Sequence, residues 1–306
     1  MKVSIVVPLL NEAESLPHLV TAVDAALAPI GHDWEIVFVD DGSTDDSYKV
    51  IGDLHTKYPS RITAVRFIRN YGKSAALSVG IEKAAGDVII TMDADLQDDP
   101  SAIPDMLKKL DEGWDLVSGW KKKRHDPVSK TLPSKFYNAI TSLFSGIRLH
   151  DFNCGFKAYR SACAKSLEIY GERHRYLPTL AHWNRFRVTE MVVPHHARKY
   201  GRSKFGIGRA TGMFDILTLL FLQKYMRKPL HFFGLIGALF IVSGTGVLGY
   251  FGVMWAITGS MHIRPLTLLS MGAVIMGIQF VSIGLIGEMI TNASPKNNYQ
   301  VRETLE

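Results

Sequence analysis

The first part of the chain alternates short apolar runs with longer amphipathic or polar stretches. Four runs rich in apolar and β-branched residues predict buried strands of one sheet: Val3–Val7, Glu35–Val39, Ile62–Ile68 and Val88–Met92. We expect a helix after each of the first three strands. The first helix begins near Glu12 with Asn11 as its cap, and the second is capped by Ser43 or Thr44. The third helix ends at Ala84. Strands that alternate with helices indicate an α/β domain with a mostly parallel sheet.

Two long apolar runs near the C-terminus have a different pattern. Leu230–Ile263 and Pro265–Gly287 contain no Asp, Glu, Lys or Arg, and each exceeds the roughly 20 residues that span a bilayer. Their glycines suit close helix packing in lipid. We therefore expect two transmembrane helices joined by a turn at Gly259–Pro265. This hairpin is flanked at both ends by basic residues: Lys224, Arg227, Lys228, Lys296 and Arg302. Their positions predict that both ends of the hairpin lie on the cytoplasmic side.

Two further segments are typical of helices at a membrane surface. Lys121–Lys135 holds six Lys or Arg and one Asp, and it leads into an apolar stripe that predicts an amphipathic helix over about 134–147. A solvated run of charges is the alternative. A second interfacial helix is expected at Met213–Met226. The expected organisation is an α/β domain over 1–208, an interfacial helix within 209–228, two transmembrane helices over 229–290 and a cytoplasmic tail over 291–306.

Composition narrows the class of protein. The 306 residues carry a net charge of +6, which suits nucleic acid, an anionic membrane or a phosphorylated substrate. The basic residues are not interleaved with aromatic ones as in a nucleic-acid module, so we expect no nucleic acid. Cys154 and Cys163 have neither metal-site spacing nor the number for a disulfide framework, which favours a reduced, cytosol-facing domain. The first apolar run is too short for a signal peptide.

The candidate chemistry lies where the fourth strand ends, in Asp93-Ala94-Asp95-Leu96-Gln97. If the chain stays extended, the side chains of Asp93, Asp95 and Gln97 point the same way. Three oxygen ligands at the carboxyl end of a sheet strand suit Mg²⁺ or Mn²⁺ bound to a substrate diphosphate. A solvated acidic turn is the alternative.

Several motifs occur in one order along the chain and carry a resemblance. They are Val6-Val7-Pro8 with Asn11-Glu12, then Val39 to Asp45, Arg69 to Lys73, and Asp93 to Gln97. Together they resemble an inverting family-2 glycosyltransferase with the GT-A fold, a Rossmann-like α/β domain. With His150 to Lys157, His196 to Phe205 and the terminal hairpin, nearly the whole chain is similar to polyprenyl-phosphate glycosyltransferases, such as dolichol-phosphate mannose synthases and bactoprenol glucosyltransferases.

The resemblance implies a role for each matching residue. Contacts to the nucleotide are implied for Pro8, Asn11, Glu12, Asp40, Lys73, Asp93, Ala94, Arg202 and Lys204. Contacts to the phosphate of the lipid acceptor are implied for Lys121, Arg124, Lys130 and Ser134, although lysine stands at two of these positions where arginine is expected. Asp93, Asp95 and Gln97 would hold the metal, and Asp95 and Asp151 would act in catalysis. For Asp45 we favour turn formation and helix capping, and for Asp151 a structural turn before Gly155 is the alternative.

The implied reaction moves one sugar from a nucleoside diphosphate sugar to undecaprenyl or dolichyl phosphate at the cytoplasmic face of the inner or plasma membrane. UDP-glucose is the first expectation for the donor, and GDP-mannose or a UDP-linked amino sugar or aminopentose are alternatives. Arg185 stands where such relatives usually have glycine, near the expected sugar pocket, so the donor stays open. A silent nucleotide-binding membrane adaptor is the alternative from another class, and a homo-oligomer is left open.

Overall fold

The computed structural model describes residues 1–122, 141–142, 145–171, 173–197, 229–259 and 265–293. The chain forms two compact units, Met1–Arg209 and Ala210–Glu306. The segments predicted as interfacial helices, 134–147 and 209–228, and the tail 291–306 lie wholly or mostly outside the described residues.

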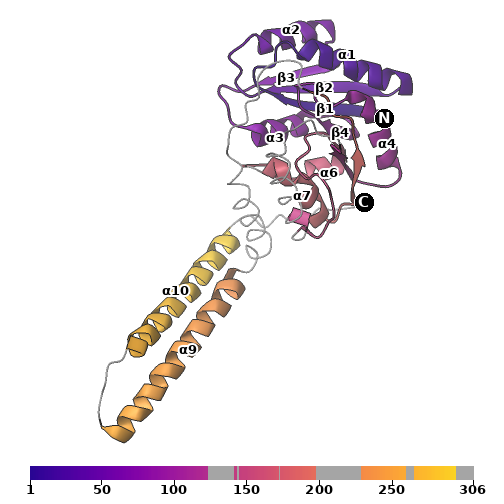
Figure 1. The fold of residues 1–306 in the computed structure, drawn as a ribbon. Coiled ribbons are helices and arrows are strands. Elements are labelled where there is room, and N and C mark those ends of the chain that lie inside the picture. Colours follow the sequence, from indigo (N-terminus) through magenta and orange to yellow (C-terminus); the bar gives the residue numbers. More distant parts are fainter. Residues whose placement is uncertain (123–140, 143–144, 172, 198–228, 260–264, 294–306) are drawn as a thin grey trace, which may run out of the picture. The chain divides into compact units, whose positions relative to one another are not determined.

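A seven-stranded sheet forms the centre of the first unit, in the order β3-β2-β1-β4-β6-β5-β7 (Figure 1). Its strands are β1 (Lys2–Leu9), β2 (Asp33–Asp40), β3 (Ile62–Arg66), β4 (Val88–Thr91), β5 (Leu116–Trp120), β6 (Lys157–Arg160) and β7 (Val188–Val192). Only β6 runs antiparallel to its neighbours β4 and β5, and the other pairs are parallel. The sheet is therefore mixed but mostly parallel, as the alternating pattern predicts.

Helices cover both faces of the sheet. They are α1 (Leu16–Leu27), α2 (Ser47–Lys57), α3 (Lys73–Lys83), α4 (Ile103–Asp111), α6 (Ser161–Lys165) and α7 (Leu177–Trp183), with 3₁₀ turns η1 (Ala28–Ile30), η2 (Pro100–Ala102) and η3 (Arg173–Tyr176). Figure 1 shows α1 and α2 on the opposite side of the sheet from α3. The side chains of β1 point alternately to the two faces of the sheet. Val3, Ile5 and Val7 pack in the core on the α1 side, whereas Val6 faces α3. A Cβ at Gly80 would lie 2.3 Å from Cγ1 of Val6, so glycine allows α3 to approach the sheet.

The first helix begins later than the sequence predicts. It starts at Leu16, with Pro17 in its first turn, rather than near Glu12. Asn11 does not cap it, because its backbone is left-handed (φ 51°) and its side chain binds the turn that follows β2. The expectation of a helix start near Glu12 is therefore wrong. The second helix is not capped by Ser43 or Thr44 either; Asp45 instead accepts a hydrogen bond from the N–H of Ser47 at 3.0 Å.

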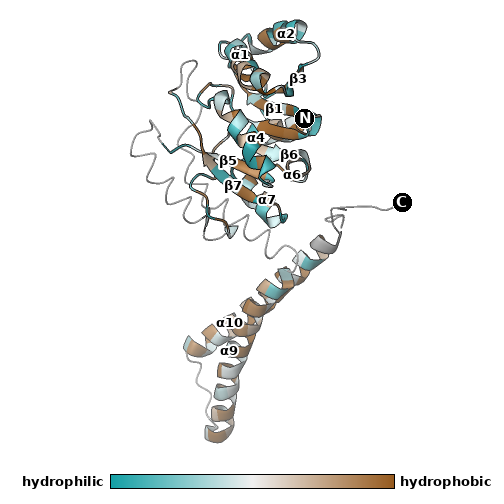
Figure 2. Cartoon of the chain, turned by 90° about the vertical axis from the view of Figure 1, so that its right-hand side faces the viewer, coloured by the Kyte–Doolittle hydropathy of each residue, from teal (hydrophilic) through white to brown (hydrophobic). Residues whose placement is uncertain are grey.

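The second unit contains two helices, α9 (Pro229–Thr258) and α10 (Pro265–Ala293), which pack into a hairpin. Both are long and apolar enough to cross a membrane (Figure 2). A Cβ at Gly237 would lie 2.6 Å from the carbonyl oxygen of Gly277, and one at Gly244 would lie 2.7 Å from that of Ser270. Glycine at these two positions thus permits the close packing expected from the sequence.

Candidate functional site

The candidate site lies at the edge of the sheet where β1, β2, β4 and β5 end and β6 begins. Asp40 ends β2, Asp93 follows β4, Lys121 follows β5, and Lys157 opens the antiparallel β6. The single reversed strand therefore brings its first side chain to the edge where its neighbours end. Such an edge is the usual ligand site of open α/β sheets.

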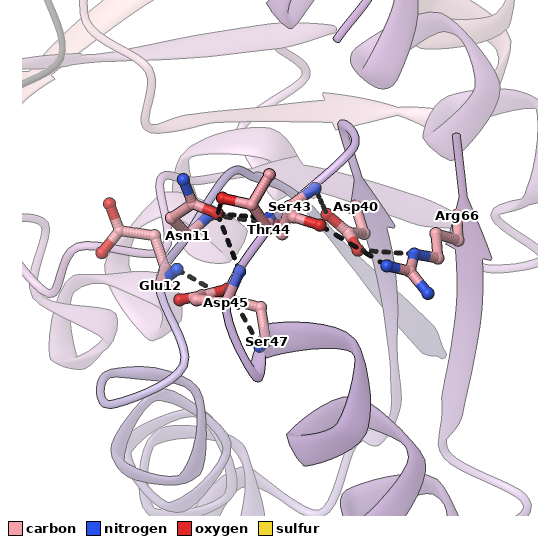
Figure 3. A network of polar contacts seen from close by, with 8 residues as sticks. All are labelled: Asn11, Glu12, Asp40, Ser43, Thr44, Asp45, Ser47 and Arg66. Carbon is pink, nitrogen blue, oxygen red and sulfur yellow. Dashed lines mark hydrogen bonds and ion pairs between the residues drawn. The ribbon is translucent and has the colours of Figure 1, made fainter. Parts of the chain in front are cut away.

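The turn after β2 is held by residues predicted to contact the nucleotide (Figure 3). The Asn11 side-chain oxygen accepts a hydrogen bond from the N–H of Thr44 at 2.8 Å. The buried Asp40 carboxylate accepts one from the N–H of Ser43 at 2.8 Å and forms an ion pair with Arg66 at 3.5 Å. Both side chains fix this turn, and the expected contact with a nucleotide stays a prediction for both.

Pro8 and Glu12 lie beside that turn. Pro8 is in β1, paired with Val39 of β2, so it belongs to the two strands that end at this edge. The backbone N–H of Glu12 donates to the Ser47 hydroxyl at 2.8 Å, and Figure 3 shows the Glu12 carboxylate directed away from the turn. The positions of both residues are compatible with a lining role, which stays a prediction.

A second carboxylate of the same turn fixes the start of α3. The two oxygens of Asp41 accept hydrogen bonds from the N–H groups of Tyr71 at 2.6 Å and Gly72 at 3.0 Å. Gly42 has φ 79°, and a Cβ there would lie 2.6 Å from the backbone of Arg69. This close packing sets the position of Lys73, the first residue of α3.

Lys73 and Asp93 form the ion pair at the centre of the site. The Lys73 ammonium group lies 2.5 Å from Oδ1 of Asp93, and both side chains are partly exposed. Burial raises the pKa of Asp93, but the positive charges of Lys73, Lys121 and Lys157 outweigh it and hold that pKa below its usual range. The Asp93 carboxylate is therefore ionised at neutral pH. Lys73 and Asp93 are both predicted to contact the nucleotide, and the structure places them in contact with each other.

The backbone of Gly155 packs against the same carboxylate. A Cβ at Gly155 would lie 2.8 Å from Oδ2 of Asp93 and 3.1 Å from its Cγ. The Gly155 carbonyl in turn accepts a hydrogen bond from the Thr91 hydroxyl at 2.8 Å, which ties the loop before β6 to β4. Glycine at this position thus sets the place of the Asp93 side chain.

The chain does not stay extended after Asp93, so the expected alternation of side chains is wrong. It turns at Leu96 (φ 57°), and the Asp95 carboxylate accepts a hydrogen bond from the N–H of Gln97 at 3.1 Å. The carbonyl of Gln97 then accepts one from the N–H of His196 at 2.9 Å, which docks this segment on the strand-like stretch 195–196. Turn formation and pairing with residues far along the chain override the local periodicity here.

The metal assignment therefore rests on donor chemistry. Asp93 and Asp95 offer carboxylate oxygens at the sheet edge, the donors that Mg²⁺ and Mn²⁺ prefer. Within the described ranges, no group of three or more His, Cys, Asp or Glu residues is placed to hold a metal ion. The predicted set needs the amide of Gln97 as its third member, and that set stays a prediction.

Asp98 and Lys121 form a buried ion pair next to this turn. Asp98 is 1% exposed, and its Oδ1 lies 2.7 Å from the Lys121 ammonium group, whose side chain is 14% exposed. Burial lowers the pKa of Lys121, but Asp98, the Cys154 sulfur and Asp93 outweigh it and raise that pKa above its usual range. Lys121 is therefore a fixed cation of the site. Its predicted contact with an acceptor phosphate stays a prediction.

Lys157 is a second buried lysine, with no role assigned from the sequence. It is 1% exposed, and its ammonium group donates a hydrogen bond to the carbonyl of Cys154. Burial lowers the pKa of Lys157, and Cys154, Asp151 and Asp93 act in the opposite direction. The Cys154 thiol itself is inert, because burial raises its pKa to about 12.

Asp151 lies in the same buried region. It is 1% exposed, and its Oδ1 accepts a hydrogen bond from the N–H of Asn153 at 3.2 Å. Its backbone carbonyl accepts one from the hydroxyl of Ser118 in β5 at 3.5 Å. The carboxylate thus shapes the turn that leads to Gly155, and its catalytic role stays a prediction.

His174 closes the Lys73 side of the site. The Ser74 hydroxyl lies 2.9 Å from Nδ1 of His174 and accepts a hydrogen bond from the His174 backbone N–H at 3.2 Å. Burial, together with the charges of Lys73 and Arg175, lowers the pKa of His174 to about 3. The imidazole is therefore neutral at physiological pH, and Ser74 can donate to its Nδ1.

Some predicted residues lie outside the described part of the chain: Arg124, Lys130 and Ser134 of the acceptor set, and Arg202 and Lys204 of the nucleotide set. Ala94 is described and is buried beside Asp93. Sequence reasoning missed Asp98, Lys157 and His174. Lys157 stands at the end of the motif His150 to Lys157, but only its place in β6 shows that it reaches the site.

The backbone of Arg185 ends helix α7. The residue is exposed, has φ 69°, and follows α7 where its N–H donates to the carbonyl of His182 at 2.9 Å. The N–H of Phe186 donates to the carbonyl of Ala181 at 3.0 Å. This is the left-handed termination that glycine favours after a helix. A glycine at this position is explained by the end of α7, without reference to a sugar pocket.

Replacing Arg185 by glycine should stabilise the domain. The substitution removes the cost of a left-handed residue with a Cβ, and we expect a gain of about 0.5–1 kcal/mol in the free energy of unfolding. The apparent melting temperature of the full chain in detergent measures it. Asn184→Gly, one residue earlier at φ −79°, is the matched control and should lower that temperature. A decrease for Arg185→Gly equal to that of the control would contradict this account of the position.

Comparison with known proteins places this geometry in a family. Residues 4–167 match glycosyl transferase family 2. The dodecaprenyl-phosphate galacturonate synthase of Rhizobium johnstonii is 35% identical, over 100% of this chain and 94% of that protein. The undecaprenyl-phosphate 4-deoxy-4-formamido-L-arabinose transferase of Klebsiella pneumoniae is 35% identical, over 94% of this chain and 88% of that protein.

Solved structures agree on the fold. The glucosyl-3-phosphoglycerate synthase of Mycobacterium tuberculosis, in complex with Mn²⁺, UDP and phosphoglyceric acid, superimposes with a TM-score of 0.55. It is 17% identical, and the match covers 72% of this chain and 78% of that one. The expected α/β architecture of GT-A type is confirmed. The chain is a glycosyltransferase that belongs to glycosyl transferase family 2.

Proposed function

We propose that this enzyme transfers one sugar from a nucleoside diphosphate sugar to a polyprenyl phosphate, with inversion at the anomeric carbon. The observation that carries the proposal is the presence in one chain of a cluster of carboxylates and lysines at the sheet edge and a hairpin of two membrane-length helices. The first serves a charged, soluble donor, and the second serves a lipid acceptor. Two relatives similar over nearly the whole chain are named for polyprenyl phosphates.

The reaction depends more on alignment of the acceptor with the donor sugar than on a general base. A phosphate oxygen of the acceptor attacks the anomeric carbon while the bond from that carbon to the nucleoside diphosphate breaks. That oxygen is already anionic near neutral pH, so no proton must be removed. Catalysis then comes from alignment and from stabilisation of the leaving diphosphate. In this mechanism Asp151 orients the sugar or the acceptor.

Charges on the described residues suit the leaving group. We assign Lys73 to the nucleotide side, where it already pairs with Asp93, and Lys121 to the acceptor side, where it pairs with Asp98. Mg²⁺ or Mn²⁺ held by Asp93, Asp95 and Gln97 would add charge compensation for the diphosphate. Arg202 and Lys204 would contact that diphosphate, and Arg124, Lys130 and Ser134 the acceptor phosphate.

The nucleotide would lie over the ends of β1 and β2. Pro8, Asn11, Glu12 and Asp40 belong to that edge. The hydrogen bonds that Asn11 and Asp40 form with Ser43 fix the shape of the surface that a base and ribose would meet. Ala94, which follows Asp93 after β4, would complete this nucleotide-binding surface. This placement is the assignment that the sequence motifs suggest.

The sugar of the donor has several candidates. Glucose carried by UDP is the first expectation from the motifs, with GDP-mannose as an alternative. Galacturonate and 4-deoxy-4-formamido-L-arabinose are the sugars named for the two relatives, and the second is a modified aminopentose, a donor class considered from the sequence. We further propose a cytoplasmic catalytic domain, from the basic residues on both sides of the hairpin.

A donor panel tests the proposal. The full chain in detergent is supplied with undecaprenyl phosphate, Mg²⁺ or Mn²⁺, and in turn UDP-glucose, GDP-mannose, UDP-galacturonate, UDP-N-acetylglucosamine or the formamido-arabinose donor. We expect release of nucleoside diphosphate with one donor, dependent on the lipid and lost on chelation of the metal. Release that is independent of undecaprenyl phosphate would contradict the acceptor assignment, and activity after chelation would contradict the metal assignment.

A further inference from the structure

A side-chain amide lies at the centre of the mostly apolar helix α10. Gln279 is the fifteenth of the 29 residues of α10, so with about 1.5 Å per residue it lies about 21 Å from each end. In a bilayer whose hydrocarbon core is about 30 Å thick, that is the middle of the apolar layer. The residue is exposed on the hairpin.

Gln279 points away from the other helix of the hairpin. Gly237 of α9 meets α10 at Gly277 and Val281, since a Cβ at Gly237 would lie 2.6 Å from the carbonyl of the first and 2.8 Å from the side chain of the second. Gln279 is two residues from each. At about 100° per residue it lies about 160° round the helix from this contact, on the opposite side.

The amide of Gln279 does not form the intrahelical hydrogen bond that the serines of the hairpin form. The hydroxyls of Ser243, Ser270 and Ser282 donate to carbonyls of their own helix, at 3.2, 2.6 and 2.9 Å. The Gln279 amide has two donors and an acceptor, and it makes no hydrogen bond to the described part of the chain. Hydrocarbon offers it none, so a polar group at the same depth must come from another molecule.

The surface around Gln279 suits a second helix. Gly272 lies seven residues before it on the same side, and a Cβ there would meet nothing within 4 Å. Ile286 lies seven residues after it and is 57% exposed. A seven-residue repeat is the period at which two parallel helices keep one seam in contact, and a small residue in that seam allows close approach.

We propose that α10 packs against α10 of a second copy of this chain, along the seam Gly272, Gln279 and Ile286. Copies inserted in the same orientation have parallel α10 helices, so a two-fold axis along the membrane normal brings each Gln279 to its counterpart at the same depth. Each amide N–H then donates to the other's Oε1, and both are satisfied. Among candidate partners, a second copy provides this match of depth and chemistry without further assumption.

Cysteine crosslinking in proteoliposomes tests the seam while it keeps Gln279. Ile286→Cys places a thiol on the seam, and Leu285→Cys, one residue earlier and also exposed, places it about 100° away. The native Cys154 and Cys163 are buried, and the unchanged chain gives their background. We expect a disulfide-linked dimer of full chains on mild oxidation for Ile286→Cys alone. Equal crosslinking of the two variants, or none above background, would overturn the proposal.

A second measurement tests the amide itself. In the Ile286→Cys chain, Gln279→Leu should lower the association constant in the bilayer, measured by energy transfer between labelled copies on dilution with lipid, by about 3- to 30-fold. The disulfide yield should fall with it, and Gln279→Asn should retain most of the association. An association constant that Gln279→Leu leaves unchanged or raises would show that the amide does not hold two copies together.

Discussion

Asp95→Asn should reduce sugar transfer by at least about 100-fold, while the protein stays folded. The substitution keeps the shape of the side chain and the oxygen that accepts the hydrogen bond from the N–H of Gln97, so the turn after Asp93 is preserved. It removes the negative charge proposed to hold a divalent cation, and with it stabilisation of the leaving diphosphate. Release of nucleoside diphosphate at saturating donor measures transfer, and thermal melting reports the fold.

Asp105→Asn is the control for this experiment. Asp105 is an exposed carboxylate of α4 that pairs only with the exposed Lys108 among the described residues. Its loss should leave transfer within about two-fold, since exposed ion pairs contribute little. Near-normal transfer by Asp95→Asn would remove the basis for the metal assignment, and a fall in melting temperature that accompanies the loss would indicate a structural role instead.

The second large effect is expected at a residue without a functional group. Gly155→Ala would place a Cβ 2.8 Å from Oδ2 of Asp93, which forces that carboxylate out of its place beside Lys73. Displacement of a positioning group by about 1 Å can cost about 100-fold in rate. We expect a loss of transfer of this order, measured as nucleoside diphosphate release at saturating donor.

The matched control is Gly52→Ala in α2. A Cβ there meets nothing within 4 Å, and alanine is the better helix former by about 1 kcal/mol. Transfer should be unchanged and the melting temperature slightly higher. If Gly155→Ala kept full activity, the contact between Gly155 and Asp93 would have no part in catalysis.

The fold could be predicted where the information is local. The strands at Lys2–Leu9, Asp33–Asp40 and Val88–Thr91 are runs whose burial is visible in their own composition. The strand β6, Lys-Ala-Tyr-Arg, contains no such run, although its lysine and tyrosine are fully buried. Its place between β4 and β5 comes from tertiary pairing, which a pattern of hydrophobic positions does not contain.

The site could be predicted in part for the same reason. The motifs identify Asp93, Lys73 and Lys121, which the structure brings to one edge of the sheet. The turn at Leu96 and the buried Lys157 depend on contacts with residues far along the chain. Arg185 shows the reverse case. Its departure from glycine is visible in the sequence, but only the structure shows that a glycine there would suit the left-handed end of α7. The expected sugar pocket nearby stays a prediction.

The mass of the lipid product tests the central proposal most directly. The full chain is incubated with undecaprenyl phosphate and the donor that supports turnover, and in parallel with 3-phosphoglycerate, a soluble phosphate acceptor, in place of the lipid. The proposal predicts undecaprenyl monophosphate heavier by one sugar residue, absent with Asp95→Asn, and no product on the soluble acceptor. A sugar found on 3-phosphoglycerate, or nucleoside diphosphate released with no glycosylated lipid, would contradict the assignment of a polyprenyl phosphate as the acceptor.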